Sequence, residues 1–121
     1  MTDKKKVGDL GEKIAKNYLI KQNYKILETN FHCRFGEIDI IAKDKEILVF
    51  VEVKTRTSTR YGQPQEAVDF LKLKKMTKTV YFYVNSKNLN NDLRIDVIAI
   101  VLNFATRKAK LTHFKDALAE S

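Results

Sequence analysis

Residues 35–55 read FGEIDIIAKDKEILVFVEVKT, and this stretch decides the fold. It contains two apolar, β-branched segments, residues 35–42 and 47–55, separated by four polar residues. Two such runs joined by a short polar turn predict a β-hairpin. Each strand carries one acid in its middle, Asp39 in the first and Glu52 in the second. Burying a carboxylate in an apolar strand is costly unless a partner compensates it, so the two acids mark a candidate site.

The register of the hairpin decides how closely the two acids approach. With a turn centred on residues 44 and 45, Asp39 lies opposite Phe50 and diagonal to Glu52; a shift by one pair places Asp39 directly opposite Glu52. Both even-length turns put the acids and Lys54 on one face, whereas an odd-length turn or a bulge would separate them. Directly opposed Cβ atoms lie about 5 Å apart, close enough for one divalent cation, and carboxylate oxygens favour Mg²⁺ or Mn²⁺. The alternative is a structural ion pair or a solvated sheet face.

The rest of the sequence supplies the elements that would flank this hairpin. Apolar residues recur at helical spacing over residues 7–21 and 69–85, and β-branched or alternating runs predict strands at 24–30, 93–103 and 110–114. The order α-β-β-β-α-β-β predicts an α/β fold with a mixed central β-sheet flanked by helices. A chain of 121 residues suits a single domain over residues 1–121, with 1–6 and about 116–121 expected to be loose.

Two buried faces are expected. The first helix is expected to bury its own apolar stripe, namely Val7, Leu10, Gly11, Ile14 and Tyr18. In the hairpin, one face of the sheet is expected to collect Ile38, Ile40, Val49, Val51 and Val53. A strand that is apolar on both sides is a central strand, covered above and below.

The charge balance points to an anionic partner. Lys and Arg number 23 against 15 Asp and Glu, which gives a net charge of +8. Nucleic acid is the commonest partner of such a surface, DNA more readily than RNA here; an anionic membrane or a merely solubilising surface are the alternatives. Positive residues concentrate between positions 54 and 78, and the candidates for phosphate contacts are Arg56, Arg60, Lys72 and Lys75.

Composition also bounds the compartment and the chemistry. The single cysteine, Cys33, excludes an internal disulfide and suits a reducing compartment. No apolar run approaches the length of a membrane-spanning helix, and no targeting segment is visible, so we expect a cytoplasmic protein without a membrane partner. A further acid, Asp96, lies in the apolar run LRIDVIAI, and we expect a structural pairing with Arg94 on the same face.

The motifs GEID, FVEVKTR and RIDV together resemble a known family. An acid followed after a spacer by Glu-x-Lys on a hairpin resembles the PD-(D/E)XK nuclease superfamily, whose core is the restriction-endonuclease-like fold. The chain more closely resembles the small bacterial YraN family, which is similar to archaeal Holliday junction resolvases, and the resemblance covers nearly the whole chain. It departs from the superfamily name at Ile38, where proline would precede the first acid.

The resemblance implies roles for individual residues. Asp39 and Glu52 would be the metal-binding acids, Lys54 the catalytic lysine, and the main-chain carbonyl of Val53 a further metal ligand. Glu12 matches an acid of the first helix that assists the metal site in similar resolvases. The resemblance also favours a functional role for Lys72 among the basic residues of the second helix.

These observations lead to an expected function and its alternatives. We expect a metal-dependent endonuclease that hydrolyses DNA phosphodiester bonds, with branched or structured DNA as the substrate that the resemblance implies. Such a resolvase needs two active sites, so a homodimer is expected with it. One alternative is a nucleic-acid-binding module that keeps the fold and cleaves little or nothing; another is a non-catalytic protein-interaction domain.

Overall fold

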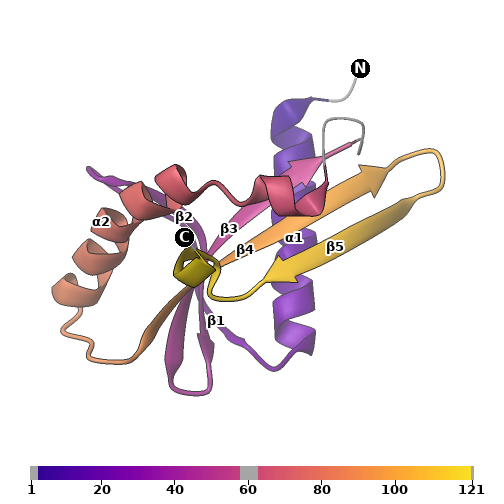
Figure 1. The fold of residues 1–121 in the computed structure, drawn as a ribbon. Helices are drawn as coiled ribbons and strands as arrows, with labels where there is room; N and C mark the ends of the chain where they lie inside the picture. The colour runs from indigo at the N-terminus through magenta and orange to yellow at the C-terminus, as the bar shows by residue number, and fades with distance from the viewer. Residues whose placement is uncertain (1–2, 58–62, 121) are drawn as a thin grey trace.

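A computed structural model describes residues 3–57 and 63–120 and confirms the predicted element order (Figure 1). Two short 3₁₀ helices are added to it. The elements are α1 (Lys4–Lys21), β1 (Lys25–Cys33), β2 (Gly36–Asp44), β3 (Ile47–Arg56), η1 (Pro64–Ala67), α2 (Phe70–Ser86), β4 (Leu93–Asn103), β5 (Lys108–Phe114) and η2 (Ala117–Glu120). Within the described ranges, no helix is long and apolar enough to cross a membrane.

The strands form one mixed sheet in the order β1-β2-β3-β4-β5. Strands β3 and β4 pair in parallel and the other neighbours are antiparallel, so α2 serves as the crossover between the parallel strands. Helix α1 packs on one face of the sheet and α2 on the other (Figure 1). The predicted α/β fold with a mixed sheet flanked by helices is therefore confirmed, and it is consistent with a restriction-endonuclease-like fold.

Strand β3 is the centre of the core, because its residues alternate between two apolar clusters. Phe50 is fully buried in the cluster on the α2 side, and Val49 and Val51 are fully buried on the α1 side. The prediction for Ile38 was wrong: it packs with Phe50 on the α2 side. β2 pairs with β3 only from Ile40 to Asp44, so Ile38, near the start of β2, lies outside that pairing.

The predicted stripe of α1 is confirmed for Gly11, which is buried, and for Val7, Ile14 and Tyr18, which pack half-buried against the cluster on the α1 side, but it was wrong for Leu10. Gly11, Ala15 and Leu19 are the buried residues of this helix, whereas Leu10 is 38% exposed. The small residues decide this orientation, because they let the helix backbone approach the sheet closely. A Cβ atom at Gly11 would lie only 1.8 Å from the hydroxyl oxygen of Thr55 on β3.

Regular secondary structure extends close to both ends of the described residues. Helix α1 begins at Lys4 because the Asp3 carboxylate accepts a hydrogen bond of 2.8 Å from the Lys5 amide and caps the helix. At the other end, η2 begins at Ala117, which is 3% exposed and belongs to the core on the α2 side. Residues 4–6 therefore belong to α1 and Ala117 packs in the core, whereas residues 1, 2 and 121 lie outside the described residues.

Candidate functional site

The β2–β3 hairpin has the register that brings its two acids together. Its turn places Lys45 at a φ of 55°, and backbone pairing continues in register to Ile40 opposite Val51. Extending that register by one pair sets Asp39 opposite Glu52, which is the shifted alternative of the two even-length turns. The two acids therefore lie at the point where the paired part of the hairpin ends.

Asp39 is held at this point by its own side chain. Its carboxylate Oδ2 accepts a hydrogen bond of 2.7 Å from the backbone amide of Val53, in place of a strand-to-strand backbone bond. Burial raises the pKa of Asp39, and repulsion by Glu52 and Glu37 adds to it, while the Val53 amide and the positive charge of Lys72 oppose the rise. The net pKa is above the ordinary value, so the carboxylate lacks sufficient positive compensation.

Glu12 lies beside Asp39 and is carried by α1, in the helical layer that covers one face of the sheet. It lies on α1, is half-buried, and has a raised pKa because of burial and the nearby charge and hydrogen bond of Asp39. Its role was left open by the sequence, and the structure places it beside Asp39. A hollow of about 400 Å³ adjoins both acids and is also lined by Lys13 and Lys16, two candidates that sequence reasoning missed. Their signal was positional, since they follow Glu12 by one and four residues on the same helix.

Glu52 is paired with a lysine from α2. Its side chain is only 11% exposed, and Oε1 lies 2.7 Å from Nζ of Lys72. Burial lowers the pKa of Lys72, but the hydrogen bond and charge of Glu52 outweigh it and the net pKa is raised. Lys54 has the opposite shift: burial and the hydrogen bond with Lys72 lower its pKa. Two ammonium groups thus compete for one carboxylate, and Lys54 is the one more readily deprotonated.

The donor set of this cluster suits a hard divalent cation with few protein ligands. Within residues 3–57 and 63–120, no three His, Cys, Asp or Glu side chains converge into a ready-made metal cage. Mg²⁺ does not require one, because it is commonly held by one or two carboxylates together with waters and substrate phosphates. Asp39 and Glu52 offer that minimal set, and the pKa of Asp39 is raised mainly by burial, with repulsion from Glu52 adding to it, so a bound cation would favour its carboxylate form.

The residues predicted to contact phosphate lie in different surroundings. One guanidinium nitrogen of Arg56, Nη1, is buried and has no hydrogen-bond partner in the part of the chain that the structure describes. Lys72 points into the acid cluster, and Lys75 lies exposed on α2. Arg60 lies outside the described residues. Gln65 follows Arg60 in the connection between β3 and α2. It lines a hollow with Phe114, and neither Asp39 nor Glu52 lines that hollow.

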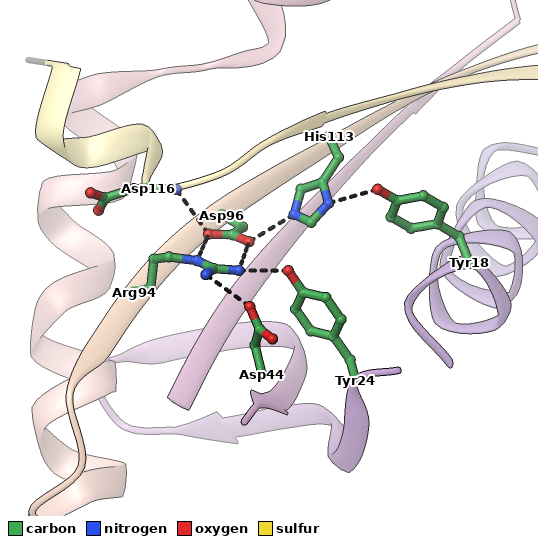
Figure 2. Close-up of polar contacts among 7 residues, drawn as sticks. All are labelled: Tyr18, Tyr24, Asp44, Arg94, Asp96, His113 and Asp116. Carbon is green, nitrogen blue, oxygen red and sulfur yellow. Dashed lines mark hydrogen bonds and ion pairs between the residues drawn. The ribbon is translucent and has the colours of Figure 1, made fainter. Parts of the chain in front are cut away.

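A second acid cluster has a structural character. Asp96 is fully buried and accepts hydrogen bonds of 2.9 and 3.0 Å from Arg94, 2.7 Å from His113 and 3.0 Å from the Asp116 amide (Figure 2). The predicted pairing with Arg94 is confirmed. Burial raises the pKa of Asp96, but the bonds from His113 and Arg94 lower it further, so the net pKa is below its ordinary value.

The network around Asp96 ties the two layers together. The Tyr18 hydroxyl on α1 lies 2.9 Å from His113 Nδ1, and Arg94 reaches Tyr24 at 2.6 Å and Asp44 at 3.1 Å (Figure 2). No local pattern in the sequence indicates these contacts of His113, because its partners come from distant elements. The network anchors α1 to β4 and β5, and therefore helps to fix the helix that carries Glu12.

Comparisons with known proteins agree with the fold and the motifs. The model of the family described as Uncharacterised protein family UPF0102 matches residues 11–100. A UPF0102 protein from Caldanaerobacter subterraneus subsp. tengcongensis is 54% identical over 102 residues, 84% of each chain. UPF0102 proteins from Clostridium tetani and Clostridium acetobutylicum are 46% and 47% identical over 114 residues, 93% of each chain. The matched region spans every candidate residue from Glu12 to Lys75.

Proposed function

We propose that this chain, which belongs to the uncharacterised protein family UPF0102, is a metal-dependent endonuclease that hydrolyses DNA phosphodiester bonds. UPF0102 is the YraN family that the motifs GEID, FVEVKTR and RIDV resemble. One observation carries the proposal: Asp39 and Glu52 meet where the β2–β3 pairing ends, with Lys54 and Lys72 beside them. The shifted pKa values of Asp39, Lys54 and Lys72 in such a cluster are typical of a functional site.

The acids would hold the cation. Asp39 and Glu52 would supply carboxylate oxygens, the main-chain carbonyl of Val53 a further ligand, and Glu12 would assist from α1. A bound Mg²⁺ or Mn²⁺ would polarise the phosphodiester and lower the pKa of a water molecule. The hydrogen bond from the Val53 amide keeps Asp39 oriented, so the site does not depend on the cation for its geometry.

The lysines would manage charge on the substrate. Lys54 has a lowered pKa and therefore can orient a water molecule or exchange a proton with it more easily than a free lysine. Lys72 neutralises Glu52 and, on release from it, would contact an oxygen of the scissile phosphate. Arg56 would contact a neighbouring phosphate through the part of its guanidinium group other than the buried Nη1.

Further features of the proposal follow from charge and from the resemblance. The net charge of +8 supports a nucleic-acid substrate held mainly through its backbone, with a strong dependence on salt. DNA with branches or other structure is the proposed substrate, and a homodimer would bring two such sites together. The single cysteine favours a cytoplasmic location.

A second candidate is a nucleic-acid-binding module with little or no cleavage activity. The ion pair of Glu52 with Lys72 favours it, because that pair already compensates one of the two acids. Both candidates predict salt-dependent DNA binding, and only the first predicts turnover that requires a divalent cation.

Cleavage assays separate the two. Labelled single-stranded, duplex, flap and four-way-junction DNA would be incubated with Mg²⁺, Mn²⁺ or EDTA. We expect cleavage with either metal and a loss of at least about 100-fold in Asp39→Asn and Lys54→Ala. Glu46→Gln is the matched control, since it removes an exposed acid from the turn of the same hairpin. Cleavage that persists in EDTA, or in both site variants, would refute the nuclease proposal.

A further inference from the structure

A hollow lined by aromatic side chains lies between the β1–β2 turn and α2. It has a volume of about 570 Å³. Phe35 from the turn and Tyr81 and Phe82 from α2 contribute the rings, which are 45%, 57% and 38% exposed. The ring centroids of Phe35 and Phe82 are 5.8 Å apart, with the ring planes tilted by 58°. These three residues form what we call the aromatic patch; Lys78, Asn85 and Ser86 complete its lining.

The aromatic patch is not explained by folding. Helix α2 already buries a complete inward face, which consists of Leu73, Met76, Thr79, Val80, Tyr83 and Val84. Tyr81 and Phe82 are not part of that buried face, and their rings stay 57% and 38% exposed. Contiguous exposed rings on a small domain are informative, because surfaces of this kind usually bind a partner.

The charge around the aromatic patch restricts the partner. The Arg34 guanidinium lies 4.9 Å from the centre of the Phe35 ring, and Lys78 lies in the lining itself. Arg34 and Lys78 would repel their counterparts if a second copy packed on this surface. Exposed rings among cations are instead complementary to a strand that carries both flat bases and phosphates, because bases stack on aromatic rings while phosphates pair with lysine and arginine.

The position of the aromatic patch connects it to the acids. Phe35 precedes Asp39 by four residues at the same end of β2, and Phe82 follows Lys72 by ten residues on α2, roughly 15 Å along the helix. An unpaired strand of a few nucleotides can cover that distance. Its backbone would run beside the lysines of α2, and its end would lie at the acid cluster.

We propose that the aromatic patch binds unpaired bases of single-stranded DNA next to the acid cluster. The inference rests on the proposed function for its substrate and deepens it, because it identifies a single-stranded segment as the part of structured DNA that the protein recognises. Stacking is tolerant of base identity, so this site selects unpaired DNA over duplex without selecting a sequence.

Binding measured in EDTA tests the proposal without requiring cleavage. Fluorescence anisotropy would follow a labelled oligothymidylate and a blunt duplex of equal length. Tyr81→Ala and Phe82→Ala should each weaken binding of the single strand by about 5- to 100-fold and leave duplex binding unchanged. Phe104→Ala is the matched control, because that ring is 51% exposed in the β4–β5 connection, outside the aromatic patch. Tyr81 is the most exposed of the three rings, so its removal leaves the core intact.

Several results would overturn the inference. Unchanged binding of the single strand in both patch variants would refute it, as would equal losses for single strand and duplex. A wild-type dimer that becomes monomeric in the patch variants, with single-strand binding retained, would assign this surface to a second copy. Tighter binding of single-stranded RNA than of DNA would refute the choice of DNA. A protein that binds single strands through the aromatic patch and cleaves none of the substrates would refute the proposed nuclease and leave this inference standing.

Discussion

Two glycines of α1 offer a matched test of how this helix meets the sheet. A Cβ atom at Gly11 would lie 1.8 Å from Oγ1, 2.7 Å from Cβ and 2.8 Å from Cγ2 of Thr55. A Cβ atom at Gly8, three residues earlier on the same helix, would meet nothing within 4 Å. Thr55 is short and β-branched and cannot turn all three atoms away. Gly11→Ala must therefore move α1 away from β3, whereas Gly8→Ala needs no adjustment.

Both substitutions gain helix propensity, and only one of them also incurs a steric cost. Replacing a helical glycine by alanine gains about 1 kcal/mol of helix propensity at either position. Overpacking at a tight contact costs about 1–3 kcal/mol, and only Gly11→Ala incurs it. Gly8→Ala should therefore stabilise the protein, and the two variants should differ by about 1–3 kcal/mol. For a chain of this size the difference corresponds to roughly 4 °C in Tm per kcal/mol.

Urea unfolding of both variants measures the difference, and metal-dependent DNA cleavage provides a second readout. Because Glu12 follows Gly11 directly, displacement of α1 should also reduce cleavage in Gly11→Ala, while Gly8→Ala keeps the wild-type rate. Equal stability of the two variants would refute the close contact between α1 and β3. A destabilised Gly11→Ala with full cleavage would instead show that Glu12 is not needed at the acid cluster.

Three further predictions concern buried polar groups. Asp96→Asn should cost about 3 kcal/mol at pH 7, because it leaves the largely buried Arg94 guanidinium without its carboxylate. Since folding lowers the pKa of Asp96, its contribution is present above the unfolded pKa of about 3.9 and is lost as the pH falls through the lower folded pKa. The gap between wild type and variant in urea unfolding should thus narrow only below about pH 4, and a constant gap would contradict the assignment. Tyr18→Phe should lower the free energy of unfolding by about 1 kcal/mol, because His113 Nδ1 loses its partner; no change would mean that water replaces the hydroxyl. Burial and a hydrogen bond with Glu28 raise the pKa of Tyr83 to about 12, so the stability that neutral Tyr83 provides is present below about pH 10 and is lost towards pH 12. Tyr83→Phe should remove the last tyrosinate absorbance transition, and its persistence would assign that transition to another tyrosine.

Local patterns predicted the elements better than their orientation. The hairpin and the strand at 93–103 follow from short runs of residues whose spacing is visible in the sequence, and β4 has the predicted bounds. The register of Asp39 with Glu52 did not follow, since two even-length turns fit the same residues. For α1, periodicity identified a helix but placed Leu10 on the buried side, because hydrophobicity takes no account of the close approach that Gly11 and Ala15 allow.

The side-chain arrangements that the sequence did not predict depend on contacts between distant elements. The partners of His113 come from α1 and β4, and the neighbours of Glu12 come from β2, so neither arrangement has a spacing that a linear pattern could reveal. The aromatic patch is of the same kind. Phe35 and Phe82 are far apart in the sequence and share one hollow only because the β1–β2 turn lies against α2.

Asp39 and Asp96 lie in nearly the same local sequence, but their carboxylates differ in the hydrogen bonds that compensate them. Asp39 in EIDII and Asp96 in RIDVI each follow an isoleucine in an apolar strand. Asp96 accepts four hydrogen bonds, and its pKa is lowered; among the described residues Asp39 accepts one from the Val53 amide and shares one with Glu12, and its pKa is raised. A carboxylate that is already satisfied gains little from a cation, whereas one crowded by Glu52 and Glu12 gains the most. The strand pattern alone does not separate these cases, because the difference is made by donors that other elements bring to each acid. The acid with fewer compensating partners is therefore the one at which to look for metal binding, and Asp96 is the one whose loss should destabilise the protein.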